Sequence, residues 1–133
     1  MSDYHDFEHF GLDPRIVAAV KAMGYTTPTP IQSKAIPIVM QGKDVMGAAQ
    51  TGTGKTAGFA LPIIQRLLPQ ASASMSPARH PVRALILAPT RELAVQVFDS
   101  FRTYGRHVPL RYSVVYGGVP IEPQTKELLA GVE

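Results

Sequence analysis

The stretch that most restricts the fold is AQTGTGKT at residues 49–56. It matches the phosphate-loop pattern G-x-x-x-x-G-K-[ST], except that Ala49 replaces the first glycine. A short apolar segment, residues 43–49, precedes it and predicts a buried strand, while residues 54–68 predict a helix ending before a proline. The alternative is a glycine-rich turn with an exposed lysine. Strand, glycine loop and helix in this order favour a nucleotide site.

Each residue type in this loop suits phosphate chemistry. Gly52 and Gly54 let successive backbone amides turn inward, and the start of the following helix adds positive charge. Lys55 would neutralise the β and γ phosphate oxygens, and the Thr56 hydroxyl would bind Mg²⁺. We therefore expect a nucleoside polyphosphate as ligand.

The remaining pattern alternates predicted strands and helices, which indicates an α/β fold with a parallel sheet flanked by helices. Residues 69–81 contain three prolines and no apolar period, so they predict a loop, and Pro37 predicts two short helices or a sharp kink in 29–42. We expect further helices at residues 13–24, at 90–105 and from about 123, and further strands at 82–89 and 110–118.

Hydrolysis needs an acid that holds the metal, normally at the end of a strand beside the loop strand. The two later predicted strands end in LAPT and VVYGG instead. The sequence therefore predicts nucleotide binding with little capacity for hydrolysis.

Composition limits the cellular compartment and the kinds of partner that we expect. The chain has no cysteine, no start that resembles a signal peptide, and no apolar run near the roughly 20 residues that span a bilayer, so we expect a cytoplasmic protein without membrane contact. From Arg66 to Arg111, seven arginines face only Glu92 and Asp99, a local excess of five positive charges. Either a polyanion is the partner or these arginines solvate helix faces.

Three further motifs surround the loop in a fixed order: GYTTPTPIQ at residues 24–32, PTRELA at 89–94 and YGG at 116–118. Together they closely resemble the N-terminal motor domain of DEAD-box ATP-dependent RNA helicases, bacterial type, from about Phe7 onward. The family's own loop begins with alanine. The resemblance implies a RecA-like P-loop NTPase domain, with residues 1–32 as its Q-motif region and 33–133 as its P-loop core, truncated after about three strands.

The resemblance also implies how ATP would bind. Gln32 would read the adenine edge, the backbone near Thr27 would support it, and Phe7 and Tyr25 would pack on the ring. As alternatives, Gln32 would only close a capping box with Thr29, and the two aromatic residues would only pack structurally. The implied ATP contacts are Phe7, Tyr25, Thr27, Gln32, Ala49, Gln50, Thr51, Gly52, Thr53, Gly54, Lys55 and Thr56, of which Lys55 and Thr56 serve catalysis and Thr56 also Mg²⁺.

RNA would bind at a second place. By resemblance, Pro89, Thr90 and Arg91 grip the backbone of one RNA strand, and Gly118 of the RNA-binding pair Gly117–Gly118 lets that backbone approach closely, which gives little sequence preference. The alternatives are a solvated arginine at a helix start and an ordinary glycine turn.

The family pattern continues beyond Glu133 with a further strand, an Asp-Glu-Ala-Asp motif and a second RecA-like domain. We therefore expect an N-terminal fragment of a helicase that binds adenine nucleotide without hydrolysing it, and that is marginally stable or self-associates through an exposed sheet edge. A stand-alone nucleotide- or RNA-binding module and a DNA-directed motor are the alternatives.

Overall fold

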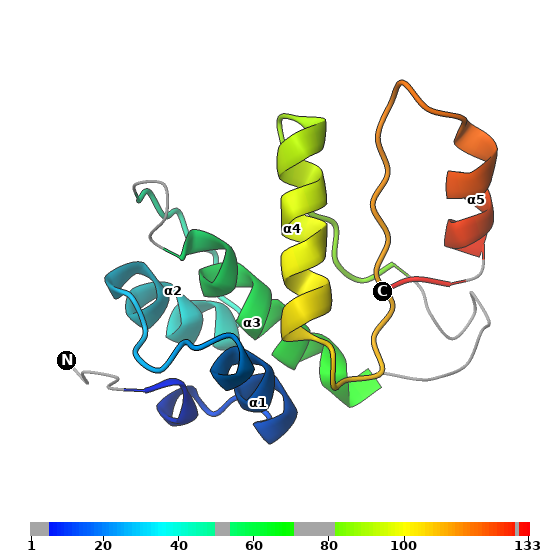
Figure 1. Ribbon diagram of the computed structural model, residues 1–133. Coiled ribbons are helices and arrows are strands. Elements are labelled where there is room, and N and C mark those ends of the chain that lie inside the picture. The colour runs from blue at the N-terminus through cyan, green and yellow to red at the C-terminus, as the bar shows by residue number, and fades with distance from the viewer. Residues whose placement is uncertain (1–5, 50–53, 71–81, 130) are drawn as a thin grey trace.

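The computed structural model describes residues 6–49, 54–70, 82–129 and 131–133. In Figure 1, α1, α2 and α3 lie together on one side of α4, whereas the trace of residues 110–118 and α5 lie on its other side. The elements in chain order are η1 (Phe7–Phe10), α1 (Pro14–Ala22), α2 (Pro30–Met40), α3 (Lys55–Leu67), η2 (Leu68–Gln70), α4 (Arg91–Tyr104) and α5 (Ile121–Leu129).

Helix α1 confirms its sequence signals. The Asp13 side chain caps it by accepting a hydrogen bond from the Arg15 amide at 2.9 Å, and Pro14 occupies the first helical position. The Arg15 guanidinium also contacts this carboxylate at 3.0 Å, and these bonds hold the pKa of Asp13 below its ordinary value. Gly24, with φ of 84°, follows the helix in the left-handed region that glycine adopts without strain.

Helix α2 excludes the first of the two structures predicted around Pro37. Residues 30–40 form a single helix with Pro37 inside it, not two short helices. A proline deletes only its own amide donor and crowds one carbonyl, and burial of Ala35 and Ile36 against the core offsets that cost. Packing therefore overrides the local proline signal here.

The two long helices follow the sequence closely. Helix α3 gives way to η2 just before Pro69, and α4 starts after Thr90, whose side chain accepts a hydrogen bond from the Leu93 amide at 3.2 Å. Gly105 ends α4 as expected. The last helix, α5, begins at Ile121, two residues earlier than predicted.

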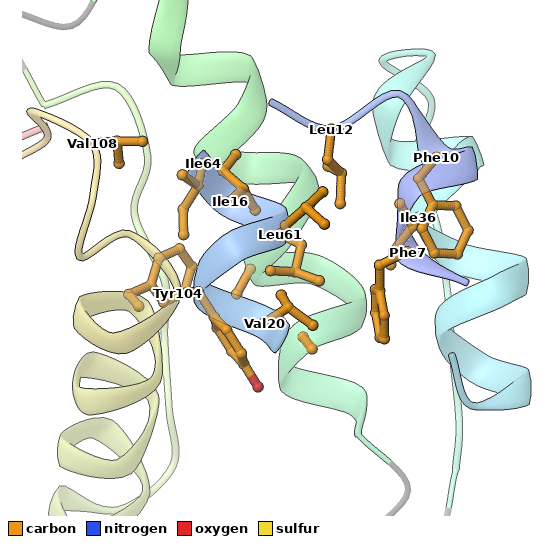
Figure 2. Packing of buried hydrophobic residues seen from close by; sticks show 14 of the residues in the cluster. Phe7, Phe10, Leu12, Ile16, Val20, Ile36, Leu61, Ile64, Tyr104 and Val108 are labelled. Carbon is orange, nitrogen blue, oxygen red and sulfur yellow. The ribbon is translucent and has the colours of Figure 1, made fainter. Parts of the chain in front are cut away.

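The core forms where α1, α3, the end of α4 and η1 meet. Ile16, Val20, Leu61 and Ile64 are fully buried, and Figure 2 shows their side chains between these helices. Tyr104 closes the cluster from α4. The buried residues of α3 in this core also fix the position of its first residues, Lys55 and Thr56.

The three predicted strands are not found. Residues 43–49, 82–89 and 110–118 have no regular secondary structure, and no strand occurs within the described ranges. Apolar side chains in them are exposed, among them Met46, Leu85 and Leu87. An extended segment becomes a strand only when a neighbour pairs with its backbone. In the described part of the chain, Glu133 bonds to the backbone of Arg83, Ala84 and Arg111, and this single residue is too short to form a ladder with either run.

The buried hydroxyl of Tyr112 is an unfavourable feature whose cost can be measured. Its hydroxyl lacks a hydrogen-bond partner among the described residues and lies over Gly105, where a Cβ would come within 1.8 Å of it. Burial, with a smaller contribution from Glu133, raises the pKa of Tyr112 from 10.0 to about 12.

We expect Tyr112→Phe to raise the free energy of unfolding by about 1 kcal/mol at neutral pH, because an unpaired buried hydroxyl is removed. The native state binds this proton more tightly than the unfolded state, so the wild type loses stability as pH rises from 10.0 toward about 12. The variant should lack that part of the loss. Urea unfolding at both ends of this pH range measures the free energy of unfolding of the two proteins. An equal decrease in wild type and variant would contradict the raised pKa of Tyr112.

Candidate nucleotide and RNA interface

The described part of the phosphate loop comprises Ala49, Gly54, Lys55 and Thr56, whereas Gln50, Thr51, Gly52 and Thr53 lie outside the described residues. Gly54 is the N-cap of α3 with φ of 81°, and no side chain caps the helix. The first amides of a helix lack partners within it and carry its positive end. Lys55 is exposed at this end and Thr56 is half-buried beside it.

Gln32 joins the Q-motif region to this loop. Its Nε2 donates to the carbonyl of Gly54 at 3.1 Å, across 22 positions of sequence. Its Oε1 accepts from the Thr29 amide at 2.9 Å, and the capping box with Thr29 is complete. A Cβ on Gly54 would lie 2.3 Å from Nε2, so only glycine allows this approach. The capping box is thus present, and the same side chain also contacts the loop.

The other proposed base contacts lie in different surroundings. Phe7 is buried, 3% exposed, and packs edge-on against Phe10 with ring centroids 5.9 Å apart. Tyr25 is 46% exposed in the turn after α1, and Thr27 is exposed nearby. The structure therefore favours core packing for Phe7, while Tyr25 offers an accessible ring.

The arginine–glycine cluster consists of Thr90, Arg91, Tyr116, Gly117 and Gly118. Arg91 Nη2 donates to the carbonyl of Gly117 at 3.0 Å, although the two residues are 26 positions apart. The guanidinium carbon lies 5.0 Å from the centroid of the Tyr116 ring, which is a cation–π distance. The predicted PTRELA and YGG motifs thus meet at the start of α4, and Pro89 is exposed beside them.

The glycine pair is asymmetric. Gly118 has φ of 81°, and a Cβ there would lie 2.6 Å from Arg91 Nη2, whereas a Cβ on Gly117 would meet nothing within 4 Å. Within the pair, Gly118 is therefore the glycine that packs closely against the Arg91 side chain. In the view of Figure 1 this turn, the start of α4 and the start of α3 lie toward the same end of the molecule.

Two residues that hold this cluster in place, Tyr116 and Gln124, were not predicted as site residues from the sequence. Tyr116 lies beneath Arg91, and its amide donates to Gln124 Oε1 at 2.8 Å. Gln124 in turn donates to the carbonyl of Pro120 at 3.2 Å, so α5 holds the turn. The position of Tyr116 directly before the glycine pair was a usable signal. No local pattern marked Gln124.

Within the described ranges, no group of three or more His, Asp or Glu side chains could hold a metal ion. Among the same residues, no helix is both long enough and apolar enough to cross a membrane.

Comparison with known proteins gives a consistent picture. The ATP-dependent rRNA helicase RRP3 of Candida albicans is 44% identical over 126 residues, which are 95% of this chain and 22% of that protein. RRP3 of Meyerozyma guilliermondii is 43% identical over 126 residues, with 95% and 25% covered. The chain therefore spans about a quarter or less of the length of these curated relatives.

Solved structures agree. The RNA helicase Prp28 from Chaetomium thermophilum, bound to ADP, is 37% identical with a TM-score of 0.84, and covers 100% of this chain and 32% of its own. A DEAD box protein from Methanococcus jannaschii is 35% identical with a TM-score of 0.83, covering 98% and 34%. The model of the DEAD/DEAH box helicase family matches residues 29–133, which are most of the sequence. The chain therefore belongs to the DEAD/DEAH box helicase family.

Proposed function

We propose that this chain forms the first nucleotide- and RNA-binding part of an ATP-dependent RNA helicase with a RecA-like parallel-sheet core, acting in the cytoplasm. By itself it binds adenine nucleotide and the RNA backbone and does not hydrolyse ATP. The observation that supports the proposal is the Gln32–Gly54 hydrogen bond, which joins the Q-motif region to the end of the phosphate loop.

The nucleotide part rests on what Gln32 can still do. A primary amide has two donor hydrogens and two acceptor lone pairs. The contact of Gln32 with Gly54 uses one donor hydrogen, and the contact with Thr29 uses one acceptor lone pair. The amide can therefore hold the loop and present a donor and an acceptor to adenine, whose edge offers the complementary pair. Guanine presents the wrong pattern to the same amide. Tyr25 is the accessible ring for base packing, and Phe7 supports this region from the core.

The phosphate part rests on the open start of α3. Its amides and Lys55 suit phosphate oxygens, and Thr56 supplies a hydroxyl for Mg²⁺, a metal that takes most of its ligands from water and phosphate. Bound Mg²⁺ would neutralise phosphate charge. Among the described residues no acidic cluster accompanies the hydroxyl, so water activation would need carboxylates from elsewhere.

The RNA part rests on the arginine–glycine cluster. Arg91 is aimed by Tyr116 and the Gly117 carbonyl, and its remaining guanidinium donors suit a phosphate. The missing Cβ of Gly118 leaves room for the Arg91 guanidinium to pack against the glycine turn. Contacts of this kind position a nucleic-acid backbone and carry no sequence information.

Nucleotide choice provides the test. We expect calorimetric titration to show saturable Mg·ADP binding, at least about tenfold weaker Mg·GDP binding, and loss of this preference in Gln32→Ala, because a mismatched polar edge leaves buried groups unpaired. Thr29→Ala is the first control, since it breaks the capping box and keeps the Gln32 amide. Gln41→Ala, at the other end of α2, is the second.

The controls separate folding from recognition. If Thr29→Ala loses the ADP preference as fully as Gln32→Ala, then capping rather than base contact explains the effect. Equal affinity of the wild type for ADP and GDP would contradict adenine recognition by Gln32.

A further inference from the structure

Helix α5 is joined to the arginine–glycine cluster by a side chain as well as by the backbone. Only Val119 and Pro120 separate the glycine pair from the first residue of α5. From the helix, Gln124 reaches back over this link, and its Oε1 accepts a hydrogen bond from the Tyr116 amide at 2.8 Å. The turn that carries Tyr116 and the glycine pair is therefore held against α5 at both of its ends.

The Gln124 amide is itself held in one orientation. Its Nε2 donates to the carbonyl of Pro120 at 3.2 Å, and the side chain is half-buried. The two ends of a primary amide are not interchangeable, because the oxygen only accepts and the nitrogen only donates. The bond to Pro120 therefore turns the oxygen toward the Tyr116 amide, where a nitrogen would leave two donors facing each other.

The position of the Tyr116 backbone sets both supports of Arg91. The ring of Tyr116 lies 5.0 Å from the guanidinium carbon, and the carbonyl of the next residue, Gly117, accepts from Nη2 at 3.0 Å. Arg91 is an exposed side chain, and an exposed arginine loses much rotamer freedom when a ligand fixes it. An arginine that is already held before binding loses less of that freedom.

We propose that Gln124 is a positioning residue for RNA binding: it fixes the turn against α5 so that Tyr116 and Gly117 hold the Arg91 guanidinium ready for an RNA phosphate. This inference rests on the proposed function of the arginine–glycine cluster. Gln124 itself touches no RNA in this scheme. It acts as a supporting hydrogen bond behind the residue that makes the contact, and the affinity of the cluster for RNA depends on the placement of α5.

A matched control exists on the same helix. The Thr125 hydroxyl donates to the carbonyl of Ile121 at 3.2 Å, so Thr125 and Gln124 each bond to the carbonyl four residues earlier. Gln124→Met and Thr125→Val each remove one such bond without changing the charge of the chain. Only Gln124→Met also removes the bond to the Tyr116 amide. A difference between the two variants therefore reports that bond and not the stability of α5.

The first measurement needs no RNA. An aromatic ring shields protons that lie over its face, so we expect upfield shifts for Arg91 side-chain protons in the carbon–proton correlation spectrum of the full chain. Arg91→Ala identifies these signals by their absence. Gln124→Met should move them toward the positions of an unstacked arginine, whereas Thr125→Val should leave them in place. Wild-type Arg91 signals in Gln124→Met overturn the positioning role.

The second measurement is the affinity for a fluorescein-labelled single-stranded RNA, followed by anisotropy. We expect Gln124→Met to weaken binding roughly two- to tenfold, which is the effect of one hydrogen bond, and Thr125→Val to bind like the wild type. The slope of log affinity against log salt should also fall by up to about one in Gln124→Met, because the phosphate contact of Arg91 is weakened. Equal losses in Gln124→Met and Thr125→Val overturn the proposal.

The double variant decides whether Gln124 acts through Arg91. In the Arg91→Ala background, Gln124→Met should change RNA affinity by less than about twofold, since the side chain that it positions is gone. Additive losses overturn the proposal, because Gln124 would then act by another route. If Gln124→Met moves the Arg91 signals but Arg91→Ala leaves RNA affinity unchanged, the positioning stands and the proposed RNA function of the cluster fails.

Discussion

Lys55→Ala is expected to weaken Mg·ADP binding at least about tenfold, because it removes the only side-chain charge that the described part of the loop offers to phosphate. The uncapped start of α3 keeps its amides in the variant, so residual binding measures the backbone contribution. Calorimetric titration with ADP and with adenosine measures the contribution of the Lys55 side chain and that of the backbone amides. The effect should appear with ADP and be nearly absent with adenosine, which has no phosphate.

Two controls sharpen this result. Lys34→Ala removes an exposed lysine from α2 and should leave ADP affinity unchanged. Lys55→Arg keeps the charge and should recover part of the affinity, though not all of it, since a planar guanidinium replaces a compact ammonium. If Lys34→Ala and Lys55→Ala behave alike, general charge rather than a phosphate site explains nucleotide binding.

Arg91→Ala is expected to weaken binding to single-stranded RNA by about five- to a hundredfold and to lower the slope of log affinity against log salt by about one, the signature of one lost phosphate contact. The loss should be similar for RNAs of different sequence, because the cluster faces the backbone. Arg102→Ala is the matched control. Its guanidinium also lies over an aromatic ring on α4, 5.5 Å from the centroid of Phe98, but outside the cluster.

Substitutions in the glycine pair, Gly117 and Gly118, test RNA binding at the cluster independently of Arg91→Ala. Gly118→Ala should reproduce most of the Arg91→Ala loss, because its Cβ would displace the guanidinium and its left-handed backbone disfavours alanine. Gly117→Ala should bind RNA like the wild type, since open space surrounds its Cβ position. Equal effects of the two alanine substitutions would contradict the geometry assigned to Gly118.

The sequence predicted the helices well because their signals are local. Asp13 with Pro14 and Thr90 with its following turn satisfy amides a few residues away, so nearby residues suffice to mark these starts. Local signals left two structures open at Pro37, and packing of the helix against the core keeps it continuous despite one missing hydrogen bond.

The candidate sites divide in the same way. The phosphate loop and PTRELA are contiguous motifs and could be found by eye. The contact of Gln32 with Gly54, and that of Arg91 with Gly117, join residues 22 and 26 positions apart, so residue identity alone could only suggest them through resemblance. Gln124, which holds Tyr116 from α5, had no local signal.

For this protein the sequence by itself determined the helices, their caps, the phosphate loop and the family, since each depends on residue types at short, fixed spacing. Only the tertiary structure decided that Gln32 serves the helix cap and the loop together, and that Gly118 rather than Gly117 is closely packed. It also decided that, within the described part of the chain, residues 85–88 and 112–115 make no backbone hydrogen bond and lie beside a groove. The physical reason is that strand pairing and side-chain contacts between distant segments depend on which surfaces the fold brings together, which no local pattern specifies.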